Sequence, residues 1–158
     1  MTERPTPEPT RALAPEALGM FTLEALLAAA PAAGVVIALA LGVLGGAAGA
    51  AVALAALAVA IAAVVVAPRV RLRRFRYEVR DDEIDLQRGI VVQTRTLVPM
   101  VRVQHVDVRR TVLSRMFGLA AVVFHTAAGA NDIPALRDAD AAAIRDRIAD
   151  LARTPEVL

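Results

Sequence analysis

The sequence predicts a two-helix transmembrane hairpin followed by a small α+β domain. Residues 25–68 contain no ionisable side chain, which is about twice the length that one helix needs to cross the bilayer core, about 20 residues. From Phe75 onward, apolar and polar residues alternate in short runs, as in half-buried strands. The last part of the chain has the apolar spacing of an amphipathic helix. We therefore expect a split barrel of antiparallel strands with a C-terminal capping helix.

Composition narrows the chemistry of this chain of 158 residues. There is no Cys, so disulfides, thiol nucleophiles and Cys-ligated metals are excluded. One Tyr, four Phe and the lack of a base-stacking motif argue against a nucleic acid partner. We divide the chain into a proline-rich, disordered cytoplasmic tail (1–17), the transmembrane hairpin (18–68) and the folded domain (69–158).

Within the hairpin, spans are expected at about 23–41 and 47–67. The segment between them is rich in glycine, which marks the turn. These glycines have the GxxxG spacing that lets helix backbones approach closely, so they are helix-packing candidates: Gly42, Gly45, Gly46 and Gly49. They could mediate self-association in the membrane, or they could only pack the hairpin against itself and form its turn.

An arginine cluster follows the second span. Its members are Arg69, Arg71, Arg73, Arg74 and Arg76. Basic flanks are enriched on the cytoplasmic side, so the sequence predicts a cytoplasmic (inner) membrane protein with both termini inside. The cluster could bind anionic lipid headgroups, or it could only fix the topology. The spans hold no ionisable residue, which argues against a transporter or an intramembrane protease.

The domain begins with alternating strands. Strands are expected near 75–79, 84–89, 91–98, 119–126 and 132–136, and residues 101–109 are expected to form a strand or a turn plus a strand. A slip in phase between Val103 and Val106 predicts a β-bulge. Residues 112–117 are expected to form one helical turn or a loop. The final helix begins near Asp138 and places Ile144, Ile148 and Leu151 on one face.

The order of these elements resembles the bacterial pleckstrin-homology-like membrane proteins of the YdbS kind. The resemblance is carried by five segments: residues 76–79, the strand end Arg88-Gly89, residues 98–108, Arg115-x-Phe117-Gly118-Leu119-Ala120, and His125-Thr126-Ala127-x-Gly129. It covers nearly everything after about residue 18. It implies two orthogonal sheets capped by a helix and a membrane-anchored interaction module. It supplies no reaction, and a phosphoinositide role does not carry over from the eukaryotic namesakes.

Few residues could support catalysis. His105 and Asp107 lie two apart, so they share a strand face, and with His125 they could form a metal site. The alternative is that each histidine is simply half-exposed on a strand. Ser114 lacks a Gly-x-Ser-x-Gly elbow, which argues against a serine hydrolase. We therefore expect no catalytic residue, no bound metal and no cofactor.

A second basic group could form a partner surface. The candidates are Arg102, Gln104, Arg109, Arg110, Leu113, Arg115 and Phe117. They could present a basic rim beside an apolar loop to a protein or a lipid surface. Alternatively, Leu113 and Phe117 close one end of the barrel and the arginines are only solvated.

These observations favour a non-enzymatic interaction or scaffolding module at the inner leaflet. Its expected partners are membrane lipids and either another membrane protein or further copies of itself. One alternative is a domain that senses anionic lipids through its arginine-rich surface. A metal-dependent membrane enzyme is a further alternative.

Overall fold

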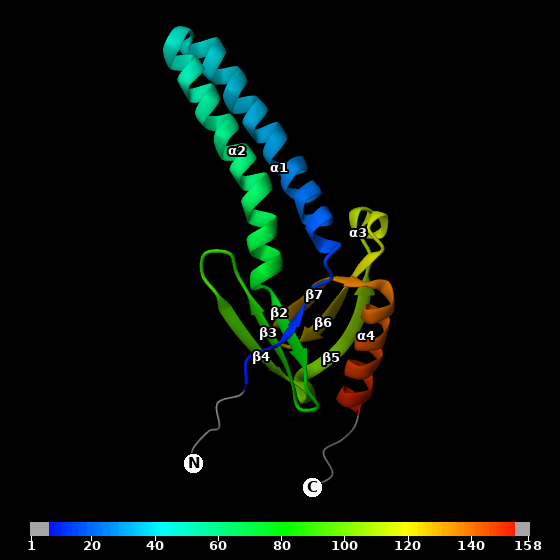
Figure 1. Ribbon diagram of the computed structural model, residues 1–158. Coiled ribbons are helices and arrows are strands. Elements are labelled where there is room, and N and C mark those ends of the chain that lie inside the picture. The colour runs from blue at the N-terminus through cyan, green and yellow to red at the C-terminus, as the bar shows by residue number, and fades with distance from the viewer. Residues whose placement is uncertain (1–6, 154–158) are drawn as a thin grey trace, which may run out of the picture. The chain divides into compact units, whose positions relative to one another are not determined.

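The computed structural model describes residues 7–153 and divides the chain into two compact units (Figure 1). One unit is helical and consists of Leu18–Arg71. The other combines the residues up to Ala17 with those from Leu72 onward. The folded domain is therefore discontinuous in sequence, because the hairpin is inserted into it.

The hairpin consists of two long helices joined by a short turn. Helix α1 (Ala17–Leu39) continues through a single π-helical segment, η1 (Ala40–Leu44), and α2 spans Gly46–Arg74. Gly45 and Gly46 turn the chain with positive φ angles of 60° and 50°, which glycine adopts without steric cost. Both helices are longer than the expected spans.

Both helices are long and apolar enough to cross a membrane. Only 6% and 0% of their most apolar windows are buried in the structure. In water, the exposure of so many apolar side chains would be costly, whereas a bilayer solvates them. The predicted two-helix hairpin is therefore confirmed as a pair of helices suited to lipid.

The domain contains two antiparallel sheets. The first has the order β1 (Arg11–Ala12), β2 (Arg76–Val79), β3 (Glu83–Arg88) and β4 (Thr94–Pro99). The second has the order β5 (Val103–Arg109), β6 (Leu119–Thr126) and β7 (Gly129–Arg137). Three helical elements complete the domain: η2 (Met100–Arg102), α3 (Val112–Met116) and α4 (Asp138–Arg153). The predicted fold class is confirmed.

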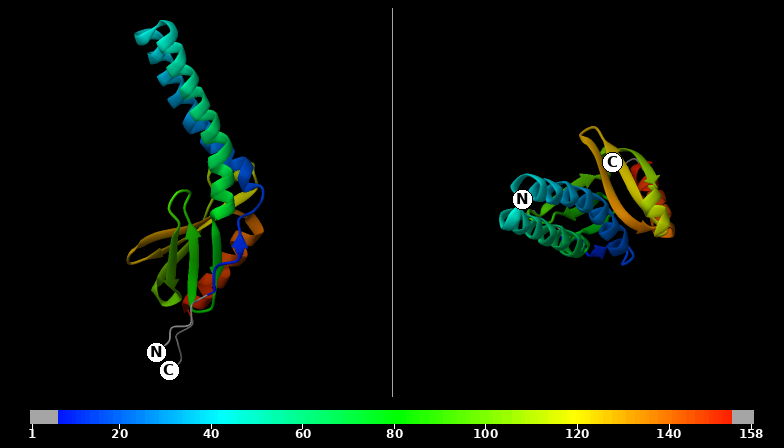
Figure 2. Two further views of the ribbon diagram at one scale, coloured as in Figure 1. Left: turned by 60° about the vertical axis from the view of Figure 1, so that its left-hand side comes forward. Right: turned by 90° about the horizontal axis from the view of Figure 1, so that it is seen from above.

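The core lies between the sheets and α4, which packs against the second sheet (Figure 2). Phe124 of β6 and Ile84 of β3 are fully buried. On α4, Ile144 and Ile148 are buried, as their spacing predicted, and Ala141 joins them. The pairing of β5 with β6 shifts register between Val103 and His105, so the predicted bulge is confirmed.

Two strand boundaries differ from the sequence-based expectation. β4 begins at Thr94 rather than at residue 91, because Gly89 turns the chain with a φ of +131° and residues 90–93 form a loop. β7 begins at Gly129 rather than at residue 132, because the turn before it is short.

The expectation of disorder over residues 1–17 does not hold for residues 10–17. β1 pairs with β2 through Arg11 opposite Tyr77 and Ala12 opposite Arg76. Leu13 is buried, and Ala14 N donates to the carbonyl oxygen of Ala135 in β7 at 3.3 Å. Residues 1–6 of the expected tail lie outside the described residues.

This N-terminal segment therefore bonds to both sheets. β1 extends the first sheet, while Ala14 and Glu16 reach β7 of the second. The carboxylate of Glu16 accepts from Arg137 Nη2 at 2.8 Å, and that bond lowers the pKa of Glu16 below its usual value. Because β1 and β2 are paired directly, a hairpin that crosses the bilayer between them must return to the side on which it started.

A buried carboxylate links the first sheet to the start of the described chain. The side chain of Asp85 in β3 is fully buried and accepts two bonds from Arg95, from Nε at 3.1 Å and from Nη2 at 2.7 Å. Arg80 Nη2 lies 3.5 Å from the same carboxylate. Arg80 and Arg95 both donate to the carbonyl oxygen of Pro7. Asp85 thereby holds the two arginines that bind the N-terminal segment.

We predict that Asp85→Asn destabilises the domain by about 2–3 kcal/mol. This is less than the 3–5 kcal/mol typical of a broken buried pair, because both guanidinium groups reach solvent. The chain has a single Tyr, Tyr77 in β2, so its fluorescence reports unfolding of the domain in denaturant while the hairpin stays silent. The matched control is Asp81→Asn, which removes an exposed pair with Arg147 and should change stability by less than about 0.5 kcal/mol. Equal losses in both variants would contradict this role of Asp85.

Candidate membrane and partner surfaces

The polar end of the hairpin is closed by an ion pair between its two helices. Arg71 Nη1 of α2 lies 3.2 Å from Glu24 Oε2 of α1. The guanidinium carbon of Arg71 also lies 4.0 Å from the ring centroid of Phe21, a cation–π geometry. Glu24 is the last charged residue before the apolar stretch, and Arg71 lies two residues beyond Arg69, the first charged residue after it.

The rest of the arginine cluster has no acidic partner among residues 7–153. Arg69 donates to the carbonyl oxygen of Val65, and Arg76 donates to that of Phe75 at 2.9 Å. Arg74 Nη1 donates to the carbonyl oxygen of Ile90 at 2.6 Å. Arg73 is exposed. These side chains carry net positive charge at the end of α2.

The four candidate glycines have different surroundings. A Cβ on Gly49 would lie 2.5 Å from the carbonyl oxygen of Ala40, so Gly49 allows the two ends of the turn to pack closely. A Cβ on Gly42, Gly45 or Gly46 would meet nothing within 4 Å. Gly45 and Gly46 serve the turn through their positive φ angles. Gly49 thus packs the hairpin against itself, which is one of the two interpretations that the sequence allowed.

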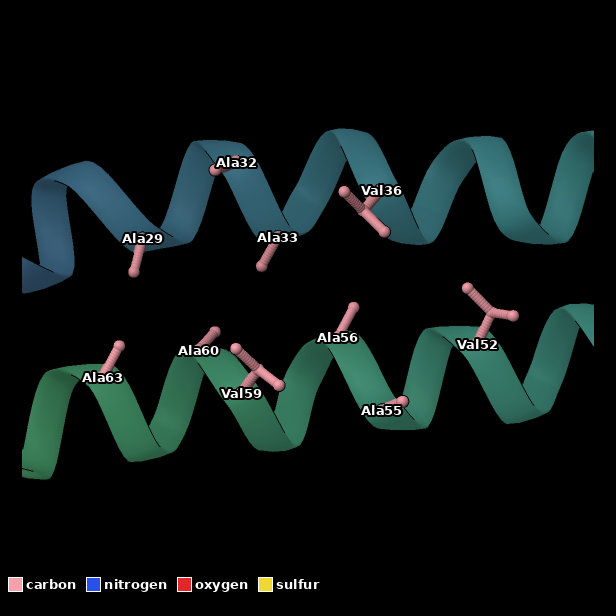
Figure 3. A pocket seen from close by; sticks show the side chains of 10 residues that line it. All are labelled: Ala29, Ala32, Ala33, Val36, Val52, Ala55, Ala56, Val59, Ala60 and Ala63. Atoms are coloured by element: carbon pink, nitrogen blue, oxygen red, sulfur yellow. The ribbon is translucent and has the colours of Figure 1, made fainter.

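Two apolar grooves run along the hairpin where its helices face each other. In Figure 3, Ala29 and Ala33 of α1 and Ala56 and Ala63 of α2 point into the space between the helices. The first groove measures about 460 Å³ and the second about 360 Å³. The first is lined by Ala29, Ala32, Ala33, Val36, Val52, Ala55, Ala56, Val59, Ala60 and Ala63. Alanine side chains are too short to fill the seam, and this leaves room for an apolar occupant.

The structure brings His105, Asp107 and His125 together on one face of the second sheet. His105 Nε2 lies 3.0 Å from Asp107 Oδ2, and His125 Nε2 lies 3.9 Å from the same atom. The two imidazole centroids are 5.9 Å apart, because His105 and His125 are opposite each other in the β5–β6 ladder. Within residues 7–153, no group of three or more such side chains is arranged to hold a metal ion.

The seven partner-surface candidates fall into two separate groups. Arg102 and Gln104 lie at the start of β5, whereas the other five lie at its far end or in and beside α3. Arg110 Nε pairs with Asp138 Oδ1 at 2.7 Å, so its charge is compensated. Leu113 and Phe117 are only partly exposed. The exposed apolar side chains of α3 are instead Val112 and Met116, at 75% and 70%.

Ser114 has a structural role. It forms a capping box with Thr111 at the start of α3: Ser114 N donates to Thr111 Oγ1 at 3.1 Å, and Thr111 N donates to Ser114 Oγ at 2.8 Å. Its hydroxyl donates to the carbonyl oxygen of Thr111. The only serine of the chain is thus buried and occupied by local hydrogen bonds.

The loop between β3 and β4 carries an exposed apolar surface that was not predicted from the sequence. Ile90, Val91 and Val92 are 43%, 89% and 75% exposed. Their β-branched side chains led us to assign residues 91 and 92 to a strand. A signal was present in the sequence, because consecutive apolar residues directly after Gly89 break the alternation expected of a half-buried strand.

Comparison with known proteins gives a family match and one similar relative. A family model described as "Bacterial PH domain" matches residues 20–152. The chain is 48% identical over 91 residues to the UPF0699 transmembrane protein YdbS of Bacillus subtilis (strain 168). That match covers 58% of this chain and 57% of the relative, so the chain spans a little over half of the relative's length. None of the solved structures matches.

The surroundings of the glycines lead to a matched prediction. Gly49→Ala should destabilise the hairpin by about 1–3 kcal/mol, because the new Cβ overpacks a close backbone contact. Gly42→Ala has free space and should leave stability unchanged or slightly raised. Loss of helical circular dichroism on titration with a denaturing detergent measures both variants. If Gly42→Ala destabilises as much as Gly49→Ala, then Gly42 contacts another copy or a partner and the assignment is wrong.

Proposed function

We propose, from the premise that the chain belongs to the family of bacterial PH domains, that it is a membrane-anchored, non-enzymatic interaction module. Its hairpin fixes the domain at the inner leaflet of the cytoplasmic membrane. Its work is to bind another membrane protein or further copies of itself.

The charge distribution supports this topology. The pairing of β1 with β2 keeps both flanks of the hairpin on the same side of the membrane. Five arginines lie between Arg69 and Arg76, at the end of the second span, while the turn around Gly45 carries no charge. Basic flanks stay on the cytoplasmic side, so we assign the domain and both termini to the cytoplasm.

The observation that carries the proposal is the larger, alanine-lined groove on the hairpin, beside a second groove lined by alanine, glycine and larger aliphatic side chains. Helices in membranes associate by close packing of small residues, since lipid gives no hydrophobic drive between them. The groove of about 460 Å³, lined only by alanine and valine, offers such a packing site, and the second groove of about 360 Å³ shares Ala29, Ala33 and Ala60 with it. A partner's transmembrane helix, or the hairpin of a second copy, has suitable shape and polarity.

A non-enzymatic role agrees with the described chemistry. Ser114 is buried in a helix cap. His105 Nε2 lies 3.0 Å from Asp107 Oδ2 on an exposed sheet face. A hollow of about 260 Å³ beside Asp107 and His125 is lined by no serine, threonine, tyrosine or lysine that could act as a nucleophile.

Lipid sensing is a second candidate, supported by the arginine cluster. Arg69, Arg73, Arg74 and Arg76 have no acidic partner within residues 7–153. A basic residue near an anionic surface contributes about 1 kcal/mol. This hypothesis predicts that the domain contacts bilayers of anionic lipid more than bilayers of zwitterionic lipid. Added salt should weaken this difference.

The test of the proposed function is gentle purification of the full chain from its native membrane, with mass spectrometry and light scattering of the particle. We expect a second membrane protein in fixed ratio, or a defined oligomer. Ala55→Leu, which fills the larger groove, should lower that association about 5- to 150-fold, because overpacking costs about 1–3 kcal/mol and 1.4 kcal/mol corresponds to a factor of ten.

The matched control is Ala58→Leu, the same substitution on the same helix at a position that lines neither groove. It should leave the particle unchanged. A bare monomer from the native membrane, or equal effects of both variants, would contradict binding through the grooves and favour the lipid-sensing candidate.

A further inference from the structure

The β3–β4 loop exposes three consecutive aliphatic side chains. Ile90, Val91 and Val92 are all exposed, and Val91 is the most exposed large apolar residue in the described chain, at 89%. Loops of soluble domains normally carry polar tips, and runs of exposed apolar residues are selected against unless they are functional. The run therefore marks a surface that is covered in the working protein.

The loop is a fixed turn that presents these side chains outward. At Gly89, with φ +131°, a Cβ would lie 1.8 Å from the carbonyl oxygen of Val92, so the two ends of the loop pack tightly against each other. The carbonyl oxygen of Ile90 accepts a hydrogen bond from Arg74 Nη1 at 2.6 Å. The loop backbone is thus held by the Arg74 bond and by the close contact of Gly89 with Val92, while its apolar side chains are exposed to solvent.

The bond to Arg74 ties the loop to the residue that ends α2. Arg74 is the last residue of α2, the helix that provides the second span. Charge begins at Arg69, and five residues of helix rise only about 7.5 Å. The headgroup region extends about 5–8 Å beyond the hydrocarbon core on each side. A loop tied to Arg74 by one side chain is therefore within reach of the headgroup layer.

From this connection we infer that the β3–β4 loop inserts Ile90, Val91 and Val92 into the lipid interface. The covering partner is the bilayer itself. The neighbouring charges fit this assignment, because Arg73 and Arg74 have no acidic partner within residues 7–153 and can face anionic headgroups. The loop is a second attachment point, which would restrain the domain against rotation about the end of α2.

The absence of cysteine allows a clean test on the full chain. A single cysteine replaces Val91 and carries an environment-sensitive fluorophore, with the protein in nanodiscs of phosphatidylethanolamine and phosphatidylglycerol. The control replaces Val101, which is 79% exposed in η2 at the other end of β4. Six residues of strand separate the two sites by about 20 Å.

Two quenchers distinguish the possible environments. We expect label 91 to be quenched several-fold more than label 101 by a lipid-borne nitroxide, and several-fold less by iodide. Amphipathic surfaces that bind bilayers bury their apolar residues about 5–10 Å into the headgroup–acyl boundary, within reach of such a nitroxide.

Every other result overturns the inference. Free access of iodide to label 91 shows that the loop is in water. Shielding from iodide without quenching by the lipid nitroxide shows that protein, such as a second copy, covers the loop. Equal lipid quenching of labels 91 and 101 shows that the fluorophore itself seeks the bilayer.

Discussion

The pairing of residues before the hairpin with residues after it is the constraint on which the rest of the structure depends. β1 precedes the hairpin and β2 follows it, and Ala12 lies opposite Arg76 in their ladder. In the same segment, Ala14 N donates a hydrogen bond to the carbonyl oxygen of Ala135 in the second sheet. The residues before the hairpin therefore bond to both sheets of the domain. The hairpin must leave and re-enter one folded body, and this requires an even number of crossings.

This arrangement explains how polar and apolar requirements divide along the chain. Within the hairpin, charge is confined to the end where Glu24 pairs with Arg71, and the remainder is left to lipid. Within residues 7–153, Asp85 is the one fully buried carboxylate of the domain. Arg80 and Arg95 compensate its charge. An unpaired charge in either place would carry a large desolvation cost. Two kinds of surface have no partner within the described residues. One is the pair of apolar grooves on the hairpin, and the other is the apolar β3–β4 loop with the arginines near the end of α2.

The sequence predicts those parts of the structure that have a period or a uniform composition. The charge-free stretch of residues 25–68 predicted the hairpin, and the alternation of apolar and polar residues predicted most of the strands. The spacing of Ile144 and Ile148 gave the buried face of α4. The two-residue spacing of His105 and Asp107 correctly placed them on one face.

The missed features depend on partners that are distant in sequence. β1 has only two residues, so it has no period, and its partner strand begins more than sixty residues later. Asp85 alternates with Ile84 and Leu86, a pattern that predicts exposure, yet the N-terminal segment and two arginines cover it. Likewise, the approach of His125 to Asp107 follows from the β5–β6 register, which local sequence does not specify.

The central claim, that the chain before the hairpin is a strand of the domain, is tested most directly by a cross-strand disulfide. Ala12→Cys and Arg76→Cys together introduce two cysteines at opposed positions of the β1–β2 ladder in a chain that has no others. Mild oxidation of the full chain in lipid should form an intramolecular disulfide, detected by mass spectrometry after proteolysis. Ala12→Cys with Arg88→Cys, whose partner in the ladder is Thr94, should not cross-link. Failure of the first pair, or equal cross-linking of both, would contradict the insertion of the hairpin into the domain.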